Sequence, residues 1–294
     1  MLDCPGMDVL VRQAAERDDY DACVRLQREV WGLSDLEITS AIQLVATVHA
    51  GGSLLVAESA GEIVGFCYAF AAVRGGEAHL HSDMLAVRPA ARGLGVGPSL
   101  KWAQREEALR RGLRLVTWTF DPMRARNARL NLRHLGAVSR ELLPDFYGET
   151  TSALHHGLPT HRLLALWELD SPRVVRRASG EPPAAPASAP LVNEVTWRDG
   201  LPVPSPARLD LAAREVHLDV PADWDEVCRA DPGLAREWQE VVRRALEGLF
   251  AAGYAAVDCL GVGRSARYVL LKDYSTPVAA GSEGSDDHSL HEPA

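Results

Sequence analysis

The sequence lacks several features that would place the protein in a special structural class. No run of about 18 apolar residues occurs, so no segment is expected to cross a membrane. The first residues lack the basic and apolar stretches of a secretory signal peptide. The five cysteines are scattered and never form a Cys-x-x-Cys pair, which argues against a disulfide scaffold or a zinc ribbon. These absences predict a cytoplasmic protein with no membrane partner.

Positive charge is also scarce. The 294 residues include 31 Lys and Arg against 40 Asp and Glu, a formal net charge of -9. Proteins that bind nucleic acid need a basic surface, so no nucleic-acid partner is expected. Hydrophobic residues at 47% and charged residues at 24% are typical of a folded globular chain. The length favours two domains or one large domain.

Composition divides the chain into two folded units. The stretch 177–190 is rich in proline, alanine and serine and is predicted to be a linker. The polar segment 275–294 is predicted to be a disordered tail. We therefore expect a first domain at 1–176 and a smaller α+β domain at 191–274.

The spacing of apolar residues predicts alternating strands and helices in the first unit. Strands are expected at 8–14, 53–58, 63–73, 77–88, 113–120 and 163–169. Helices are expected at 16–31, at 95–111, at 127–135, and from Ser34, where Glu37 would complete a capping box. Antiparallel strands followed by a β-α-β-α-β order predict an α+β (α/β) fold with one parallel crossover.

The second unit shows a weaker pattern. A strand at 216–220, a helical segment at 224–252 broken near Pro232, and a hairpin at 254–271 are expected. Its Gly-Val-Gly motif at 261–263 is not followed by a helical pattern, so no second ligand site is predicted. We expect this unit to pack on the first, to cover the substrate side, or to pair subunits in a homodimer.

A glycine-rich turn joins the strand that ends near Arg88 to the next helix. It reads Arg92-Gly93-Leu94-Gly95-Val96-Gly97-Pro98. Glycines let successive backbone N–H groups turn toward one point, and a helix N-terminus adds about half a positive charge. This combination is typical of a pyrophosphate site.

Two common phosphate motifs do not fit this turn. A Walker loop needs Gly-Lys-Ser/Thr where this chain has Gly97-Pro98-Ser99. A dinucleotide fingerprint needs a glycine at position 98 or 100, and Pro98 and Leu100 stand there. Residues 88–140 nevertheless carry twelve Arg or Lys against three acids, which favours an anionic ligand nearby. A solvated helix face is the alternative for any one of these cations.

The pattern Arg92-x-x-Gly95-x-Gly97 behind Val87-Arg-Pro89 resembles the GCN5-related N-acetyltransferase (GNAT) superfamily. The resemblance covers about residues 7–170 and implies a mixed, mainly antiparallel sheet with a splayed parallel strand pair. It also implies that acetyl-CoA, or another acyl-CoA, is the co-substrate. The residues implied to contact it are Leu85, Ala86, Val87, Arg92, Gly93, Leu94, Gly95, Val96 and Gly97.

Members of the superfamily transfer the acyl group directly to an amine, which calls for a base and an acid. Strand alternation places His79, His81, Asp83, Leu85 and Val87 on one face. His81 matches the position of a carboxylate base in histone-type relatives and is the leading base, with Asp83 orienting it or acting itself. A structural hydrogen-bonded pair is one alternative. Metal ligation by His79, His81 and Asp83 is another, although we expect no metal.

The tyrosine acid that is common in the superfamily is missing here. Four residues before Gly136 this sequence has Leu132. Tyr147 is the nearest replacement acid, with a core or loop role as its alternative, and solvent can also supply the proton. Asn127 and Asn131 are four residues apart and are expected on one helix face, where they could bind the pantetheine or phosphates.

These features together predict an acyl-CoA-dependent N-acyltransferase that acts on a small-molecule amine or an amino-acid-like acceptor. One alternative is a non-catalytic acyl-CoA sensor, which Leu132 in place of the tyrosine would suit. An O-acyltransferase is another, because the same base can activate an alcohol. Acceptor loops vary independently of the cofactor loop, so the sequence leaves the acceptor open.

Overall fold

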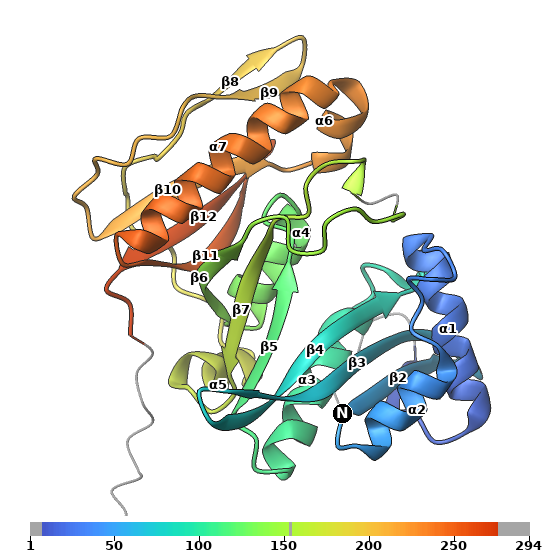
Figure 1. The fold of residues 1–294 in the computed structure, drawn as a ribbon. Helices are drawn as coiled ribbons and strands as arrows, with labels where there is room; N and C mark the ends of the chain where they lie inside the picture. Colours follow the sequence, from blue (N-terminus) through green and yellow to red (C-terminus); the bar gives the residue numbers. More distant parts are fainter. Residues whose placement is uncertain (1–7, 153–154, 276–294) are drawn as a thin grey trace, which may run out of the picture.

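A computed structural model describes residues 8–152 and 155–275. Ten strands form one sheet in the order β1-β2-β3-β4-β5-β7-β6-β11-β12-β10 (Figure 1). Within the described residues, β4 and β5 are the only parallel neighbours in this sheet. Strands β8 and β9 form a separate hairpin. The predicted mixed, mainly antiparallel α+β fold with one parallel pair is confirmed.

The elements follow one another from a strand-rich first part to a helix-and-strand second part. The strands are β1 Leu10–Gln13, β2 Ser53–Ser59, β3 Glu62–Arg74, β4 Glu77–Val87, β5 Leu115–Phe120, β6 Val138–Leu143, β7 Arg162–Glu168, β8 Val195–Arg198, β9 Leu201–Pro204, β10 Glu215–Pro221, β11 Tyr254–Val262 and β12 Ser265–Lys272. The helices are α1 Arg17–Trp31, α2 Ala41–His49, α3 Val96–Arg110, α4 Ala125–Ala128, α5 Pro172–Ala178, α6 Trp224–Ala230 and α7 Pro232–Ala251. A 3₁₀ turn, Pro89–Ala91, precedes α3, and a π-helix, Arg129–His134, follows α4.

Helices cover both faces of the sheet's first four strands. Leu26 of α1 and Leu44 of α2 pack with Phe66 of β3 on one face. Leu100 of α3 packs with Cys67 of β3 on the other face. Because a fully buried leucine contributes about 1.5–3 kcal/mol, these apolar stripes fix α3 against the sheet and place its N-terminus beside the end of β4.

The second helix begins later than predicted. Ser34 Oγ does donate to Glu37 at 2.9 Å, but residues 32–40 form a turn rather than a helix. Helix α2 begins at Ala41, and the Ser40 hydroxyl oxygen accepts a hydrogen bond from the Gln43 N–H at 3.3 Å. The capping-box pattern was misleading because the Glu37 carboxylate binds a distant loop instead.

Strand β6, helix α5 and the β8–β9 hairpin were missed by the sequence analysis. Only Val138 and Ser139 of β6 are buried, and the polar Arg140 and Glu141 follow them. A short, partly exposed strand of this kind carries little alternation.

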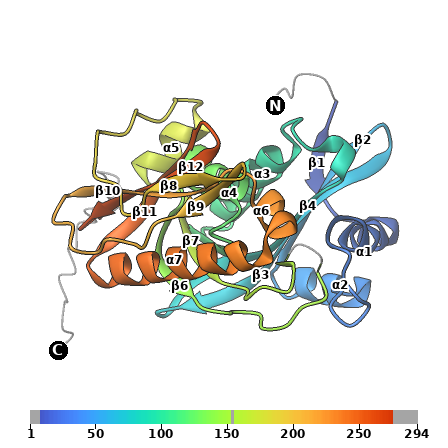
Figure 2. The ribbon, with the colours of Figure 1, turned by 90° about the horizontal axis from the view of Figure 1, so that it is seen from above.

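The strands of the second part extend the sheet of the first. Ala256 of β11 lies opposite Ser139 of β6, and β12 and β10 follow. Helix α7 packs over β6, β9, β10 and β11, and Figure 2 shows it running along one face. One buried cluster includes both Trp167 and Trp238, from the two parts.

The division of the chain into two domains stays a prediction. Residues 179–190 contain no helix or strand, in keeping with the proposed linker composition. The predicted tail at 275–294 lies outside the described residues, apart from Ser275.

Candidate active site

Strands β4 and β5 separate soon after they meet. Their parallel ladder joins Leu80 to Val116 and His81 to Thr117. From Ser82 to Val87, no strand of the described chain lies on the β5 side of β4. This open edge presents unpaired backbone groups that an extended ligand could bind as an added strand does.

A β-bulge at Asp83 interrupts β4 at the point of separation. Ser82 lies opposite Ala69 of β3, and Met84 lies opposite Tyr68, so Asp83 is the extra residue. A bulge of this kind re-aims the side chains that follow it.

The shared face expected along β4 is therefore divided. Lys101 of α3 donates to Ser82 Oγ at 3.1 Å, so Ser82 faces α3. Leu85 and Val87 also pack against α3, whereas His81, next to Ser82, points to the opposite face. The prediction that His81, Leu85 and Val87 share a face was wrong because the extra residue at Asp83 reverses the alternation.

The glycine loop leads from β4 into α3 as the sequence predicts. Gly93 and Gly95 both have φ of 83°, a left-handed conformation that favours glycine. Gly95 caps the helix, and Val96 is its first residue. The two glycines thus allow the tight backbone turn that leads from β4 into α3.

The backbone N–H groups of residues 93–97 are free of internal bonds. Among residues 8–152 and 155–275, no group accepts a hydrogen bond from any of them. The neighbouring Arg92 N–H donates to the Pro89 carbonyl at 3.2 Å, and the Ser99 N–H donates to the Gly95 carbonyl at 3.0 Å. A Cβ placed on Gly93 would meet no atom within 4 Å, so side chains do not close the bend. Free N–H groups at a helix start fit a diphosphate.

Arg92 is the cation closest in sequence to this turn that has no carboxylate partner among the described residues. It is exposed, and its Nε donates to the Val87 carbonyl oxygen at 3.1 Å. Arg88, by contrast, is ion-paired with Glu62 at 2.8 Å. Arg92 is therefore the guanidinium left to meet an anion here.

His81 lies where the two strands part. Its Nδ1 is 2.9 Å from Thr117 Oγ1, and burial lowers its pKa to about 4, so the ring is neutral at pH 7. Asp83 is exposed, yet the protein atoms around it dehydrate its carboxyl and raise its pKa. Within the described chain these two side chains share no hydrogen bond, so Thr117 orients the imidazole instead of Asp83.

Tyr147 comes from the long β6–β7 loop and reaches the same strand. Its hydroxyl is 3.1 Å from Thr119 Oγ1, and Thr119 lies two residues after Thr117 on one face of β5. Leu132, which replaces the usual tyrosine, is fully buried in the core. The two threonines of β5, which the sequence analysis overlooked, thus place His81 and Tyr147 along one polar row.

The two asparagines expected to share a helix face are divided. Asn127 is exposed on α4, whereas Asn131 is buried within the π-helix that begins at Arg129. The wider π turn, with its i→i+5 bonds, breaks the four-residue spacing that aligns neighbours in an α-helix.

The β6–β7 loop also carries three histidines, none of which was assigned a role. His156 Nε2 lies 2.8 Å from Asp225 of α6, and His161 Nδ1 accepts the Asp145 N–H at 3.1 Å. His155 lies 3.5 Å from Arg162. Arg162 could not be singled out from the sequence, because a lone arginine before a strand is common.

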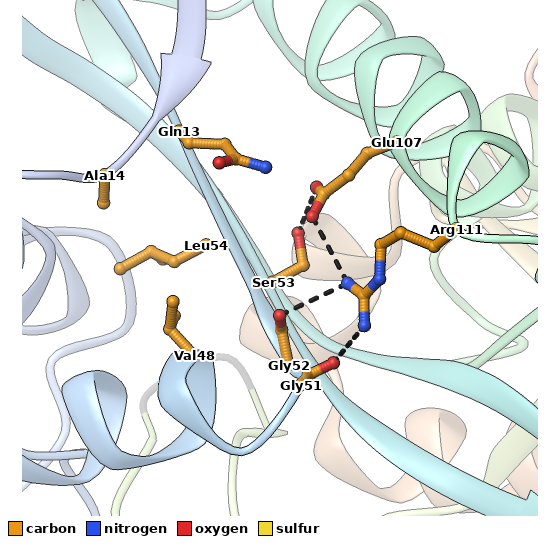
Figure 3. A pocket seen from close by; sticks show the side chains of 9 residues that line it. All are labelled: Gln13, Ala14, Val48, Gly51, Gly52, Ser53, Leu54, Glu107 and Arg111. Carbon is orange, nitrogen blue, oxygen red and sulfur yellow. Dashed lines mark hydrogen bonds and ion pairs between the residues drawn. The ribbon is translucent and has the colours of Figure 1, made fainter.

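A cavity of about 300 Å³ lies away from these residues, at the other end of α3 (Figure 3). Arg111 there donates to Glu107 and to the Gly52 carbonyl, each at 3.3 Å, and also to the Gly51 carbonyl. Helix α3 spans about 20 Å between this cavity and the glycine loop. Since Arg111 is already engaged by the protein, we assign no ligand to this cavity. Its lining residues include members of α2, β2 and α3.

Among the described residues, no three His, Cys, Asp or Glu side chains gather so that they could hold a metal ion. None of the helices in the described part has the length and apolar character needed to cross a membrane.

The first part of the chain is similar to several solved structures. A GNAT-family protein from Desulfovibrio desulfuricans is 17% identical, with a TM-score of 0.46, over 55% of this chain and 99% of its own. The yncA protein from Salmonella typhimurium, whose structure holds acetyl-CoA, is 19% identical, with a TM-score of 0.43, over 55% of this chain and 94% of its own. Ard1 from Thermoplasma volcanium is 18% identical, with a TM-score of 0.43, over 54% of this chain and 95% of its own.

No curated protein matches the chain. The model of the acetyltransferase (GNAT) family, however, matches residues 17–136, which include the separated strands β4 and β5 and the glycine loop. Residues 17–136 are therefore an acetyltransferase domain of the GNAT family, as the sequence motif predicted.

Proposed function

We propose that this chain transfers an acetyl group from acetyl-CoA to the amine of a small molecule. The observation that carries the proposal is the set of unbonded N–H groups from Gly93 to Gly97, beside the open edge of β4. The N–H groups suit a diphosphate, and the open edge suits an extended amide-containing chain. Acetyl-CoA offers both, together with an acetyl group held as a reactive thioester.

His81 and Tyr147 are the groups we propose for proton transfer. An alkyl ammonium, with an ordinary pKa near 10, must lose a proton before its nitrogen can attack. In this proposal neutral His81 takes the proton, directly or through water. Tyr147 donates a proton to the leaving sulfur. Unpaired N–H groups on the open edge of β4 can donate toward the reacting carbonyl oxygen.

Asp83 is the second candidate base. Burial lowers the pKa of His81 to about 4, which makes this imidazole a weak base. Burial raises the pKa of Asp83 instead, which makes its carboxylate a stronger base than an ordinary aspartate. The variants His81→Gln and Asp83→Asn separate the two. The variant that loses the acidic limb of the kcat/KM pH profile identifies the base.

Gly97→Glu tests the phosphate site directly. A Cβ at Gly97 meets Val87 at an ordinary 3.8 Å, so the fold tolerates a side chain. A carboxylate in the first turn stabilises α3 by about 0.5 kcal/mol but repels a diphosphate, so we expect an unchanged or higher Tm and a weaker acetyl-CoA Kd by about 30-fold. Gly97→Gln is the neutral control and should lose less affinity. Isothermal titration in which the wild-type protein shows no binding of acetyl-CoA would contradict the proposal.

A non-catalytic acyl-CoA sensor is the second candidate function, favoured by the buried Leu132 in the position of the usual acid. Release of free CoA thiol separates the two. A sensor binds acetyl-CoA but releases no thiol above background with any amine, and an O-acyltransferase releases it with alcohols instead.

A cytoplasmic location completes the proposal. The cysteines Cys23, Cys67, Cys228 and Cys259 are all unpaired and buried, which suits a reducing compartment. Cell fractionation of the expressed protein tests the location.

A further inference from the structure

Arg162 carries a guanidinium that forms no ion pair with any described carboxylate. It begins β7 and is partly buried. Its Nη2 donates to His155 Nε2 at a long 3.5 Å, and its buried Nε has no partner among the described residues. Arg124 differs, because it lies 2.6 Å from Asp225.

The guanidinium of Arg162 lies beside Tyr147, one of the two proposed proton-transfer groups. Its Cζ is 5.0 Å from the centre of the Tyr147 ring. The Tyr147 hydroxyl contacts Thr119 at 3.1 Å, and His81 contacts Thr117 at 2.9 Å, on the same face of β5. Arg162 is thus on the side of β5 from which an acceptor amine would approach His81.

The groups around Arg162 do not provide it with an ion-pair partner. Burial, and next the charge of Arg162 itself, lowers the pKa of His155 to about 4, so this neighbour is neutral at pH 7. Asp121, which follows β5, is close enough for the charge of Arg162 to lower its pKa, although burial raises that pKa more. Its carboxylate accepts the Met123 N–H at 2.8 Å and forms no ion pair with Arg162. A partly buried cation without an anion loses hydration and gains no ion pair in return. A carboxylate on a ligand would supply that anion.

Exposed aromatic rings lie next to the same groups. Phe146 and Tyr147 are each 48% exposed, and Phe70 is 38% exposed. Phe146 packs edge-on against Tyr147 at 4.8 Å between ring centres, and Phe70 lies 5.1 Å from the ring of His81. Exposed aromatic rings around a few polar groups are typical of a site for a ligand with an apolar body.

We propose that Arg162 binds the carboxylate of the acceptor, and that the acceptor is an amino acid with a large apolar side chain. This inference rests on the proposed function, since it brings the amine of that amino acid toward His81. Guanidinium and carboxylate form two parallel charge-assisted hydrogen bonds, which fix orientation as well as affinity. The rings of Phe70, Phe146 and Tyr147 would contact the side chain.

The test compares three amines that differ only in the acid group: racemic phenylalanine, phenylalaninamide and 2-phenylethylamine. Thiol release from acetyl-CoA gives kcat/KM for each with the wild type, Arg162→Gln, Arg162→Lys and the control Arg110→Gln. Arg110 lies on the exposed last turn of α3. Binding of each amine to the CoA-loaded protein is measured by calorimetry in parallel.

We expect the wild type to prefer phenylalanine to both analogues, which carry the amine but lack the carboxylate. Arg162→Gln should lower kcat/KM for phenylalanine about 100-fold and for 2-phenylethylamine less than threefold, with partial recovery in Arg162→Lys. Equal use of the three amines, or an equal loss for all of them in Arg162→Gln, would overturn the inference. If no amine releases thiol, the proposed function fails, and the calorimetry still decides whether Arg162 selects the carboxylate.

Discussion

The hydroxyl oxygen of Tyr147 lies 3.1 Å from the hydroxyl oxygen of Thr119. This contact ties a half-exposed loop tyrosine to the central strand β5, two residues from the threonine that holds His81. Leu132, on the helix after β5, is fully buried and has no polar group to offer. Tyr147 is therefore the residue whose role as the acid we propose to test.

Tyr147→Phe should lower kcat without changing the acetyl-CoA Kd. Removal of a general acid typically costs about 10²–10⁴-fold, and solvent protons should limit the loss here to about tenfold. The exposed side chain makes a stability change above about 0.5 kcal/mol unexpected. Thiol-release kinetics give kcat, and Tyr68→Phe, whose hydroxyl contacts Thr47 on α2, is the control. An unchanged kcat in Tyr147→Phe would assign the proton to solvent.

Buried neutral histidines should make the fold less stable in mild acid. The pKa values of His81 and His155 are both lowered from 6.5 to about 4, chiefly by burial. The unfolded chain therefore takes up protons near pH 6.5 and the folded chain only near pH 4. The unfolded state binds more protons between these pH values. The contribution of the two histidines to the free energy of unfolding is therefore largest above pH 6.5 and decreases as the pH drops toward 4.

His155→Gln should reduce this acid-induced loss. Chemical denaturation at pH 7, 6 and 5 gives the free energy of unfolding for the wild type and the variant. His49→Gln, at an exposed site on α2, is the control and should follow the wild type. The interpretation fails if the variant loses as much stability between pH 7 and 5 as the wild type does.

The glycine loop could be predicted from the sequence because its cause is local. Positive φ at Gly93 and Gly95 depends on the absence of a Cβ at those two positions, and the helix that follows is set by its own apolar residues. The direction of side chains along β4 could not be predicted. The bulge at Asp83 lies where β4 pairs with β3 and packs against α3. No glycine or other residue typical of a bulge marks this position in the sequence.

The arginine-rich segment 88–140 is a second case in which contacts distant in sequence could not be predicted. Its excess of arginines was interpreted as a sign of an anionic ligand. Arg124 and Arg133 of this segment instead lie 2.6 Å from Asp225 and Asp258 in the second part of the chain. Those carboxylates are 101 and 125 residues away in sequence, so local charge counting could not find them. Only part of the local positive charge is left for a ligand.

Glu37→Gln should release the β6–β7 loop. The Glu37 carboxylate accepts hydrogen bonds from the Thr151 N–H at 2.9 Å, the Thr150 hydroxyl at 2.8 Å and the Ser34 hydroxyl at 2.9 Å. The bond from the Thr151 N–H is the main cause of its lowered pKa. Because the loop carries Tyr147, we expect the acceptor KM to rise about fivefold with little change in the acetyl-CoA Kd.

The control for Glu37 is Asp35→Asn, in the same turn. Asp35 pairs with Arg28 at 2.8 Å and does not reach the loop. Limited proteolysis within 144–161 should be faster in Glu37→Gln than in Asp35→Asn. Equal cleavage rates would show that the loop is held by other contacts.

The ion pair between Arg133 and Asp258 should contribute strongly to the attachment of the second part of the chain. Its side chains are only 18% and 12% exposed. Burial raises the pKa of Asp258 despite this partner, so the carboxylate depends on Arg133 to remain charged inside the protein. Removing one partner of a buried pair costs about 3–5 kcal/mol, and Arg133→Met should fall in this range at pH 7.

A double variant and a change of pH separate the ion pair from packing. Arg133→Met with Asp258→Asn should lose less stability than the sum of the single variants, because neither charge is left buried alone. Arg133→Met should also recover part of its loss at pH 5. There the carboxyl of Asp258, whose raised pKa lies above that of the unfolded chain, takes up a proton more readily in the folded state. Additive losses that do not change with pH would mean that Arg133 stabilises the interface through its aliphatic stem alone.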